Sequence, residues 1–273
     1  MTKQVSYNSW MRTIIKQWEA NASARFKELS RNKDHTYSEI LCPILVALLS
    51  RFACGTSVLD AGCGLGFFTD YATRERFEVS GVDVSPNCVK LARSTFPQLR
   101  FCCKSITSFS MSNNNAFDAC VANMLLHNVP NVADVLRSVS LLLKPRGVFI
   151  GCIPHPVHWF ASRRLMSTRI LIDNEQAYLT PFKIRNSAVH PAPFTYFDRS
   201  CEYYWDMMAK AGFCAIQAVS FDDVNWLPKD IVFFVASRRT RAKGHVADLF
   251  REHDQQSNDH SGPQCDRDEL KIR

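Results

Sequence analysis

The sequence predicts an α/β protein built on a mostly parallel, doubly wound sheet. From residue 57 onward, short apolar runs that suit strands alternate with segments of helical periodicity. Such alternation is typical of crossover units, which give parallel sheets. Apolar residues make up 46% of the chain and charged residues 22%, so a sizeable core can form. The predicted strands are SVLDA (57–61), EVSGVDV (78–84), LRFCC (99–103), FDACVANM (117–124) and GVFIGCI (147–153).

Helices and two further strands are expected around this sheet. Apolar side chains at helical spacing predict a helix over 10–29, and Pro43 is expected to start or kink a second one. Thr36 and Glu39 suggest a capping box ahead of that second helix. Toward the carboxyl end, a helix ended by Gly212 and the strand candidates CAIQAVSF and DIVFFVAS would complete the sheet.

The segment 154–199 breaks the alternation. It holds seven aromatic residues and three histidines, a composition that favours an insertion over the ligand-binding edge of the sheet. From residue 240 the chain is polar and mixed in charge, which is typical of disorder. One domain accounts for the length. The predicted division is an N-terminal helical cap over 1–50, a domain over 51–239 that contains the 154–199 insertion, and a disordered tail over 240–273.

Composition excludes several classes of protein. The amino terminus lacks an apolar stretch followed by a cleavage site, and the most apolar run, 40–49, is too short to span a bilayer and contains Pro43. We therefore expect no membrane segment and a cytoplasmic location. The eleven cysteines include no C-x-x-C pair, and reduced thiols are the better interpretation.

The formal net charge is +7, and part of it lies in Arg238, Arg239, Arg241 and Lys243. A cluster of this kind is more often a solvated terminus than a nucleic-acid-binding arm. No separate RNA-binding module is visible in the sequence. Nucleic acid is therefore disfavoured as a partner, and the oligomeric state stays open.

The strongest local signal is the segment VLDAGCGLGFFT. A strand ends at Asp60, and Gly62, Gly64 and Gly66 follow at alternate positions before a helix. Glycines let a ligand approach the backbone, and a helix start offers free N–H groups to a carboxylate. A dinucleotide site has a similar loop, but its G-x-G-x-x-G spacing would need glycine where Phe67 stands.

The second signal is Asp83, at the end of EVSGVDV and about one crossover unit downstream of the loop. An acidic side chain at this position can accept hydrogen bonds from both hydroxyls of a ribose. The alternative is a helix cap at the end of a strand. The loop and Asp83 together favour a nucleoside-bearing cofactor.

Residues 57–153 resemble the cofactor half of class I S-adenosylmethionine-dependent methyltransferases, of the type that acts on small molecules. The match consists of the glycine loop, Asp83, FDACVANMLLHNV and LLLKPRGVF, in that order. The resemblance implies a seven-stranded Rossmann-like sheet, S-adenosylmethionine as donor and S-adenosylhomocysteine as product. It also implies a set of cofactor-binding residues, which are Asp60, Gly62, Gly64, Gly66, Asp83, Val84, Ser105, Ile106 and Asn123.

Two positions depart from the family pattern. Ser105 stands where an aspartate is common after the third strand, so adenine would meet a serine hydroxyl with Ile106 as apolar neighbour. Arg146 replaces a glycine in a turn far from the expected cofactor pocket. Use of the cofactor is compatible with both changes.

Two histidines are candidates for the reaction itself. His127 follows the fourth strand, which ends at Asn123, and either faces the acceptor or fixes its own loop. His155 lies in IPHPVHWF, which resembles the His-Pro motif of some small-molecule methyltransferases. It would orient or deprotonate the acceptor, or only shape the pocket. A metal site built from His155, His158 and His190 lacks a supporting carboxylate motif, so no metal is expected.

Methyl transfer needs alignment of a nucleophile with the donor and exclusion of water. The acceptor-side candidates are Tyr37, His127, His155, Trp159 and Tyr196, although aromatic residues of such an insertion are more often core. The predicted activity is methylation of an oxygen or nitrogen on a small-molecule metabolite. The alternatives are methylation of RNA or protein, and a homologue that binds the cofactor without catalysis.

Overall fold

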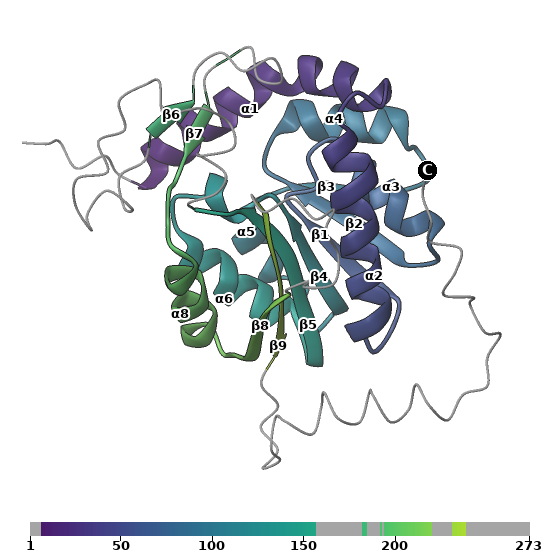
Figure 1. Cartoon of the computed structure of the whole chain (residues 1–273). Coiled ribbons are helices and arrows are strands. Elements are labelled where there is room, and N and C mark those ends of the chain that lie inside the picture. The colour runs from purple at the N-terminus through teal and green to yellow at the C-terminus, as the bar shows by residue number, and fades with distance from the viewer. Residues whose placement is uncertain (1–6, 157–181, 185–191, 193, 220–230, 239–273) are drawn as a thin grey trace, which may run out of the picture. The chain divides into compact units, whose positions relative to one another are not determined.

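The computed structural model describes residues 7–156, 182–184, 192, 194–219 and 231–238 (Figure 1). All of them belong to one compact unit that ends at Thr240. The predicted tail over 240–273 lies outside the described residues. None of the helices in the described part is long and apolar enough to cross a membrane.

The predicted sheet is confirmed. Its strand order is β3-β2-β1-β4-β5-β9-β8. Strands β1 to β5 are parallel, and β9 runs antiparallel to both of its neighbours. The strands are β1 Ser57–Ala61, β2 Glu78–Asp83, β3 Arg100–Cys103, β4 Phe117–Asn123, β5 Leu143–Pro154, β8 Phe213–Val219 and β9 Ile231–Arg238.

Alternate residues of the central strands enter two separate cores because successive side chains point to opposite faces of a sheet. Val58 packs with α2 (Cys42–Phe52) and α3 (Phe67–Arg74). Its neighbour Leu59 packs with α6 (Val132–Leu142) and α8 (Cys201–Lys210) on the other face, where α5 (Ile106–Ser110) also lies. Helix α4 (Pro86–Thr95) covers β2 and β3.

The amino-terminal segment forms helices that pack on the large sheet and on the small second sheet. Helix α1 (Tyr7–Ser30) contacts β7 (Phe194–Tyr196), which pairs with β6 (Phe182–Ile184) in a small second sheet (Figure 1). Pro43 lies at the start of α2, as predicted. The predicted boundary at residue 50 therefore falls inside α2, a helix that packs on the large sheet.

Two local predictions were wrong. Thr36 and Glu39 form no capping box, because Thr36–Leu41 is a π-helix (η1) and Asp34 accepts the backbone N–H of Tyr37 instead. The turn expected around Arg146 lies inside β5, where the pairing with β4 shifts register. Arg146 absorbs the irregularity with a positive φ of 67°.

Candidate active site

A large cavity opens at the carboxyl ends of the parallel strands. The strand order reverses between β1 and β4, and ligands of open α/β sheets bind at such a switch point. The cavity has a volume of about 810 Å³, within the usual range for ligand pockets. Its walls come from the glycine loop, the ends of β2 and β4, helix α1, η1 and β7.

The glycine loop between β1 and α3 forms one side of this cavity. Gly64 has a φ of +51°, and a Cβ atom built there would have no neighbour within 4 Å. Gly66 has a φ of +80°, and a Cβ there would collide with the Phe101 ring at 2.6 Å. Gly64 therefore leaves room for a ligand against the backbone, whereas Gly66 permits close packing of α3 on the sheet.

Asp83 ends β2 beside this loop. Its carboxylate accepts hydrogen bonds from the backbone N–H of Gly64 at 3.0 Å and of Ser85 at 2.8 Å. Burial raises the pKa of Asp83, while these backbone hydrogen bonds oppose the rise. Two carboxylate oxygens offer about four acceptor sites, so both oxygens can still accept from a ribose. The predicted helix-cap role goes instead to Ser85, whose hydroxyl caps α4.

Asp60, at the end of β1, is only 1% exposed. Its carboxylate accepts a 2.6 Å hydrogen bond from the Thr69 hydroxyl on α3. Burial raises the pKa of Asp60 to about 7, and the nearby charge of Asp83 adds to the rise. A cationic group in the cavity would stabilise the ionised form of this carboxyl.

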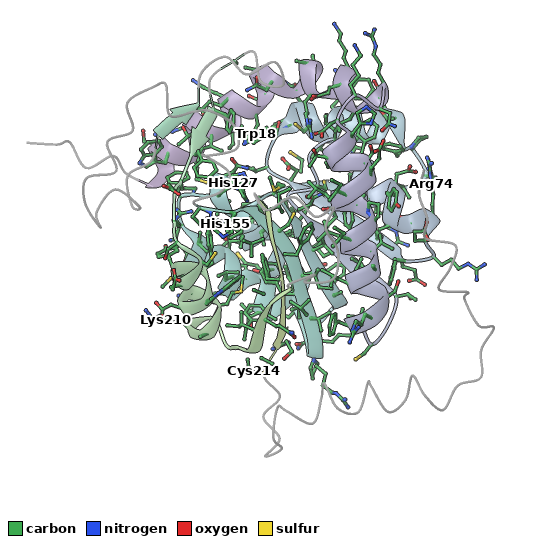
Figure 2. The ribbon with its side chains drawn as sticks, viewed as in Figure 1. Trp18, Arg74, His127, His155, Lys210 and Cys214 are labelled. Carbon is green, nitrogen blue, oxygen red and sulfur yellow. The ribbon has the colours of Figure 1, made fainter. Side chains whose placement is uncertain are left out.

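The opposite wall is apolar and aromatic. Trp18 of α1 packs against Phe194 of β7 with ring centroids 6.0 Å apart, and Ile14 is next to it on the same helix. Tyr196 lies over the His127 ring with centroids 5.1 Å apart. Figure 2 shows Trp18, His127 and His155 at the same end of the sheet, away from Lys210 and Cys214.

Polar side chains of α1 hold β7 in place. The amide of Asn21, which is fully buried, bonds both the N–H and the C=O of Ala192, at 2.9 and 3.1 Å. Gln17 accepts the N–H of Thr195 at 2.9 Å. Hydrogen bonds as well as packing therefore hold β7 against α1 in the aromatic wall.

Near η1 the cavity is lined by Arg25, which is paired with carboxylates of this chain. The Arg25 guanidinium contacts Glu28 and Asp34, each at 2.7 Å, and lies 5.5 Å from the Tyr37 ring. Burial raises the pKa of Tyr37 well above its usual value, so the phenol stays protonated. The positive charge of Arg25 is therefore already matched by carboxylates of this chain.

Many of the predicted site residues meet in this cavity. Its wall contains Tyr37, Asp60, Gly62, Gly64, Asp83, Val84, Asn123, His127 and Tyr196. Ser105 and Ile106 are not part of the wall, because Ser105 caps α5 and Ile106 is buried in the core. Gly66 also lies behind it. Half-buried His155 follows Pro154, which is part of the wall, and Trp159 lies outside the described residues.

The Asn123 carbonyl oxygen accepts from the Cys152 thiol at 3.3 Å, and its amide nitrogen is buried with no acceptor among the described residues. His127 is 6% exposed. Within the described residues no cluster of three or more metal-binding side chains occurs, and His158 and His190 lie outside them.

The central part of the chain matches a known protein family. Residues 59–151 match the methyltransferase domain family, and this span contains the glycine loop, Asp83 and β4. Residues 59–151 therefore form a class I S-adenosylmethionine-dependent methyltransferase domain. The fit of the cofactor to this chain is supported by the open space at Gly64 and by the acceptor capacity of Asp83.

Individual relatives of the methyltransferase domain act on small molecules according to their names. The chain is 31% identical over 97 residues to a ubiquinone biosynthesis O-methyltransferase of Xanthomonas oryzae. This alignment covers 34% of this chain and 41% of that protein. The chain thus spans less than half of this relative. It is 25% identical over 174 residues to a demethylmenaquinone methyltransferase of Tropheryma whipplei, covering 63% of this chain and 69% of that protein.

A solved structure supports the fold. A 1,6-didemethyltoxoflavin-N1-methyltransferase of Burkholderia thailandensis, with S-adenosylhomocysteine bound, aligns with a TM-score of 0.50 at 18% identity. The alignment covers 80% of this chain and 87% of that one. A coverage of 80% means that the likeness in fold extends beyond residues 59–151.

Sequence reasoning missed several residues around the methyltransferase site. Thr69, which bonds Asp60, gives no pattern by which it could be found, because the contact depends on the position of α3. Trp18 was visible as an apolar residue of a helix, but nothing in its spacing pointed to a cavity. Asn21 and Gln17 look like ordinary polar positions on that helix.

Proposed function

We propose that this protein transfers a methyl group from S-adenosylmethionine to an oxygen or nitrogen of a small molecule. The observation that carries the proposal is the cavity in which Asp83 and the glycine loop face an apolar, aromatic wall. Its volume of about 810 Å³ is in the upper part of the range for ligand pockets, which suits a donor and a compact acceptor together.

The donor, when bound, supplies an electrophilic methyl group on a sulfonium. Asp83 would hold the ribose and the open backbone at Gly64 would receive the donor, while Asp60 would offer negative charge to its cationic part. Val84 and Asn123 would complete the donor side. The remaining task of the chain is to orient the acceptor and to exclude water, which is what an apolar wall does well.

The acceptor side favours an uncharged molecule with an apolar ring. Trp18, Phe194 and Tyr196 offer aromatic surface. Of the two described cations of the wall, Arg25 is already paired with Glu28 and Asp34, and Lys33 is exposed to solvent. A phosphorylated metabolite would need an uncompensated cation or an anion-binding backbone. The named relatives, a ubiquinone biosynthesis O-methyltransferase and a demethylmenaquinone methyltransferase, carry the names of small-molecule pathways or substrates, which supports a small acceptor.

His155 is our candidate for orienting or deprotonating the acceptor. It directly follows Pro154 of the wall and lies at the base of the predicted acceptor-side insertion, 154–199. A phenol or other hydroxyl acceptor would benefit from a placed imidazole, whereas a neutral amine would not need one. Trp159 would belong to the same side of the site.

The test is methyl transfer from donor labelled in its methyl group. We would offer separate pools of phenols and hydroquinones, ring amines, sugar phosphates, bulk RNA and bulk protein. Label in the phenol or ring-amine pool is expected. Label in the RNA or protein pool alone would refute the proposal. So would tight binding of S-adenosylhomocysteine with no transfer to any pool, which would indicate a non-catalytic cofactor-binding protein.

A further inference from the structure

The loop after β4 is folded around a buried arginine from a distant part of the chain. Arg199 is 6% exposed. Its guanidinium donates to the backbone carbonyls of Leu126 at 3.2 Å, Val129 at 2.9 Å and Pro130 at 3.1 Å. These carbonyls belong to the loop that carries His127. One side chain thus fixes the course of this wall segment.

Among the described residues, the positive charge of Arg199 is stabilised by backbone carbonyl oxygens and aromatic rings and not by a carboxylate. No described carboxylate forms a salt bridge with it, and its guanidinium carbon lies 4.7 Å from the Phe197 ring and 5.5 Å from the Tyr203 ring. A planar guanidinium can donate along several directions while stacking on aromatic faces. Lysine has no planar fork and could satisfy only part of this arrangement.

The same loop is joined to β7 through its backbone. The N–H of Phe197 donates to the carbonyl of His127 at 2.9 Å, and the His127 ring stacks on Tyr196. Arg199 and Phe197 therefore connect the end of the 154–199 segment to the loop after β4. Arg199 is not part of the cavity wall and acts on it through these neighbours.

A second contact sets the protonation of the His127 ring. The Asn128 amide nitrogen donates to the Met124 carbonyl at 2.9 Å, which identifies this atom as the nitrogen because a carbonyl can only accept. The same nitrogen lies 3.0 Å from Nε2 of His127. Nε2 must then accept the second N–H of the amide, and so carries no proton. In a neutral imidazole the proton then resides on Nδ1.

We propose that Asn128 and Arg199 are positioning residues of the acceptor site, which together hold His127 as a neutral imidazole with its proton on Nδ1. His127 is then excluded as a general base at Nε2 and serves as a fixed part of the wall, with Tyr196 stacked on it. The description of this wall as the acceptor site rests on the proposed function. The tautomer does not.

The first test is nitrogen NMR of the full chain labelled with ¹⁵N-histidine and saturated with S-adenosylhomocysteine. The His127→Gln variant assigns the His127 signals. We expect Nε2 of His127 to be unprotonated and Nδ1 to carry the proton. A proton on Nε2 in the wild-type protein would overturn the proposal, and this result needs no further variant to fold.

Two variants test the assigned causes. In Asn128→Asp a carboxylate replaces the amide donor, so we expect the proton to move to Nε2. In Arg199→Lys we expect the tautomer to persist but the His127 signals to shift, because the loop loses part of its anchor. The control is Arg137→Lys, on an exposed face of α6, which should leave these signals unchanged. Unmoved His127 signals in folded Asn128→Asp or Arg199→Lys would remove that residue from the proposal.

A binding measurement separates positioning from general destabilisation. The probe is 2-naphthol, a neutral aromatic phenol, followed by tryptophan fluorescence, and S-adenosylhomocysteine affinity is measured by calorimetry. Arg199→Lys should weaken 2-naphthol binding about tenfold, equivalent to about 1.4 kcal/mol, with S-adenosylhomocysteine affinity unchanged. An equal loss for both ligands would indicate a merely structural role and would overturn the positioning claim. If the tautomer is as expected but the wild-type protein neither binds 2-naphthol nor methylates any pool, the proposed function fails instead.

Discussion

Replacing Asp60 by asparagine should stabilise the protein at alkaline pH while weakening donor binding. The Asp60 carboxyl is buried, and its pKa is raised from 3.8 to about 7. A group that binds its proton more tightly in the folded state loses stability as pH rises between these two values, because the unfolded chain gives up the proton first. Above pH 7 both states are ionised, and the loss becomes constant.

The magnitude follows from these two pKa values. Between pH 5 and pH 8 the destabilisation from Asp60 should grow by about 2.5 kcal/mol, at 1.36 kcal/mol for each unit of difference in bound protons. The side chain introduced by Asp60→Asn cannot ionise, and its amide oxygen can still accept from the Thr69 hydroxyl. The melting temperature of Asp60→Asn relative to wild type should therefore rise by about 5–10 °C from pH 5 to pH 8.

Differential scanning calorimetry across this pH range is the assay. Asp206→Asn, at an exposed position of α8, controls for the loss of one carboxylate. S-adenosylmethionine should bind Asp60→Asn about tenfold more weakly than wild type at pH 8, because the variant lacks a charge that favours a cation. Melting curves of wild type and Asp60→Asn that move in parallel with pH would refute the reasoning, as would an equal change in Asp206→Asn.

Three further variants test the donor and acceptor sides. Asp83→Ala should weaken S-adenosylhomocysteine binding by about 1.5–3 kcal/mol in calorimetry with the fold intact, and unchanged affinity would show that the ribose lies elsewhere. Gly64→Ala should cost about 1 kcal/mol of stability because of its positive φ, and the added methyl should reduce donor affinity further, so a variant with wild-type donor affinity would contradict the assigned approach. His155→Ala should lower single-turnover methylation about tenfold to a thousandfold with little change in donor affinity, whereas normal turnover would exclude it from the reaction.

The sheet could be predicted because its signals are local. Each strand is a short apolar run, and each crossover helix has its own periodicity, so the five parallel strands follow from the sequence with boundaries that differ by a few residues. The errors arose where tertiary contacts decide. At Thr36 the chain forms a π-helix against α2. Residues 144–147 form an irregularity inside β5, between Leu143 and Val148, which pair with Phe117 and Ala119 of β4.

The candidate site was predictable on one side only. Asp60, Gly64 and Asp83 follow strand ends in a fixed order, and the fold brings such ends to one edge. The apolar wall proposed for the acceptor depends on helix α1 lying at that edge, and no spacing in the sequence tells where a helix will lie. Arg199 illustrates the limit, because its carbonyl partners are some 70 residues away in sequence and present no side-chain pattern.

The described strands between Pro154 and Cys201 pair only with each other, and none of them joins the large sheet. Strand β5 pairs directly with β9, so the hydrogen bonds of the large sheet do not involve the strands of this segment. Replacing the segment during evolution would leave the registers of β4, β5 and β9 unchanged. Exchange of this one stretch of chain would change the proposed acceptor side and leave the sheet intact, provided that the replacement kept an arginine at its carboxyl end to bind the carbonyls of the loop after β4.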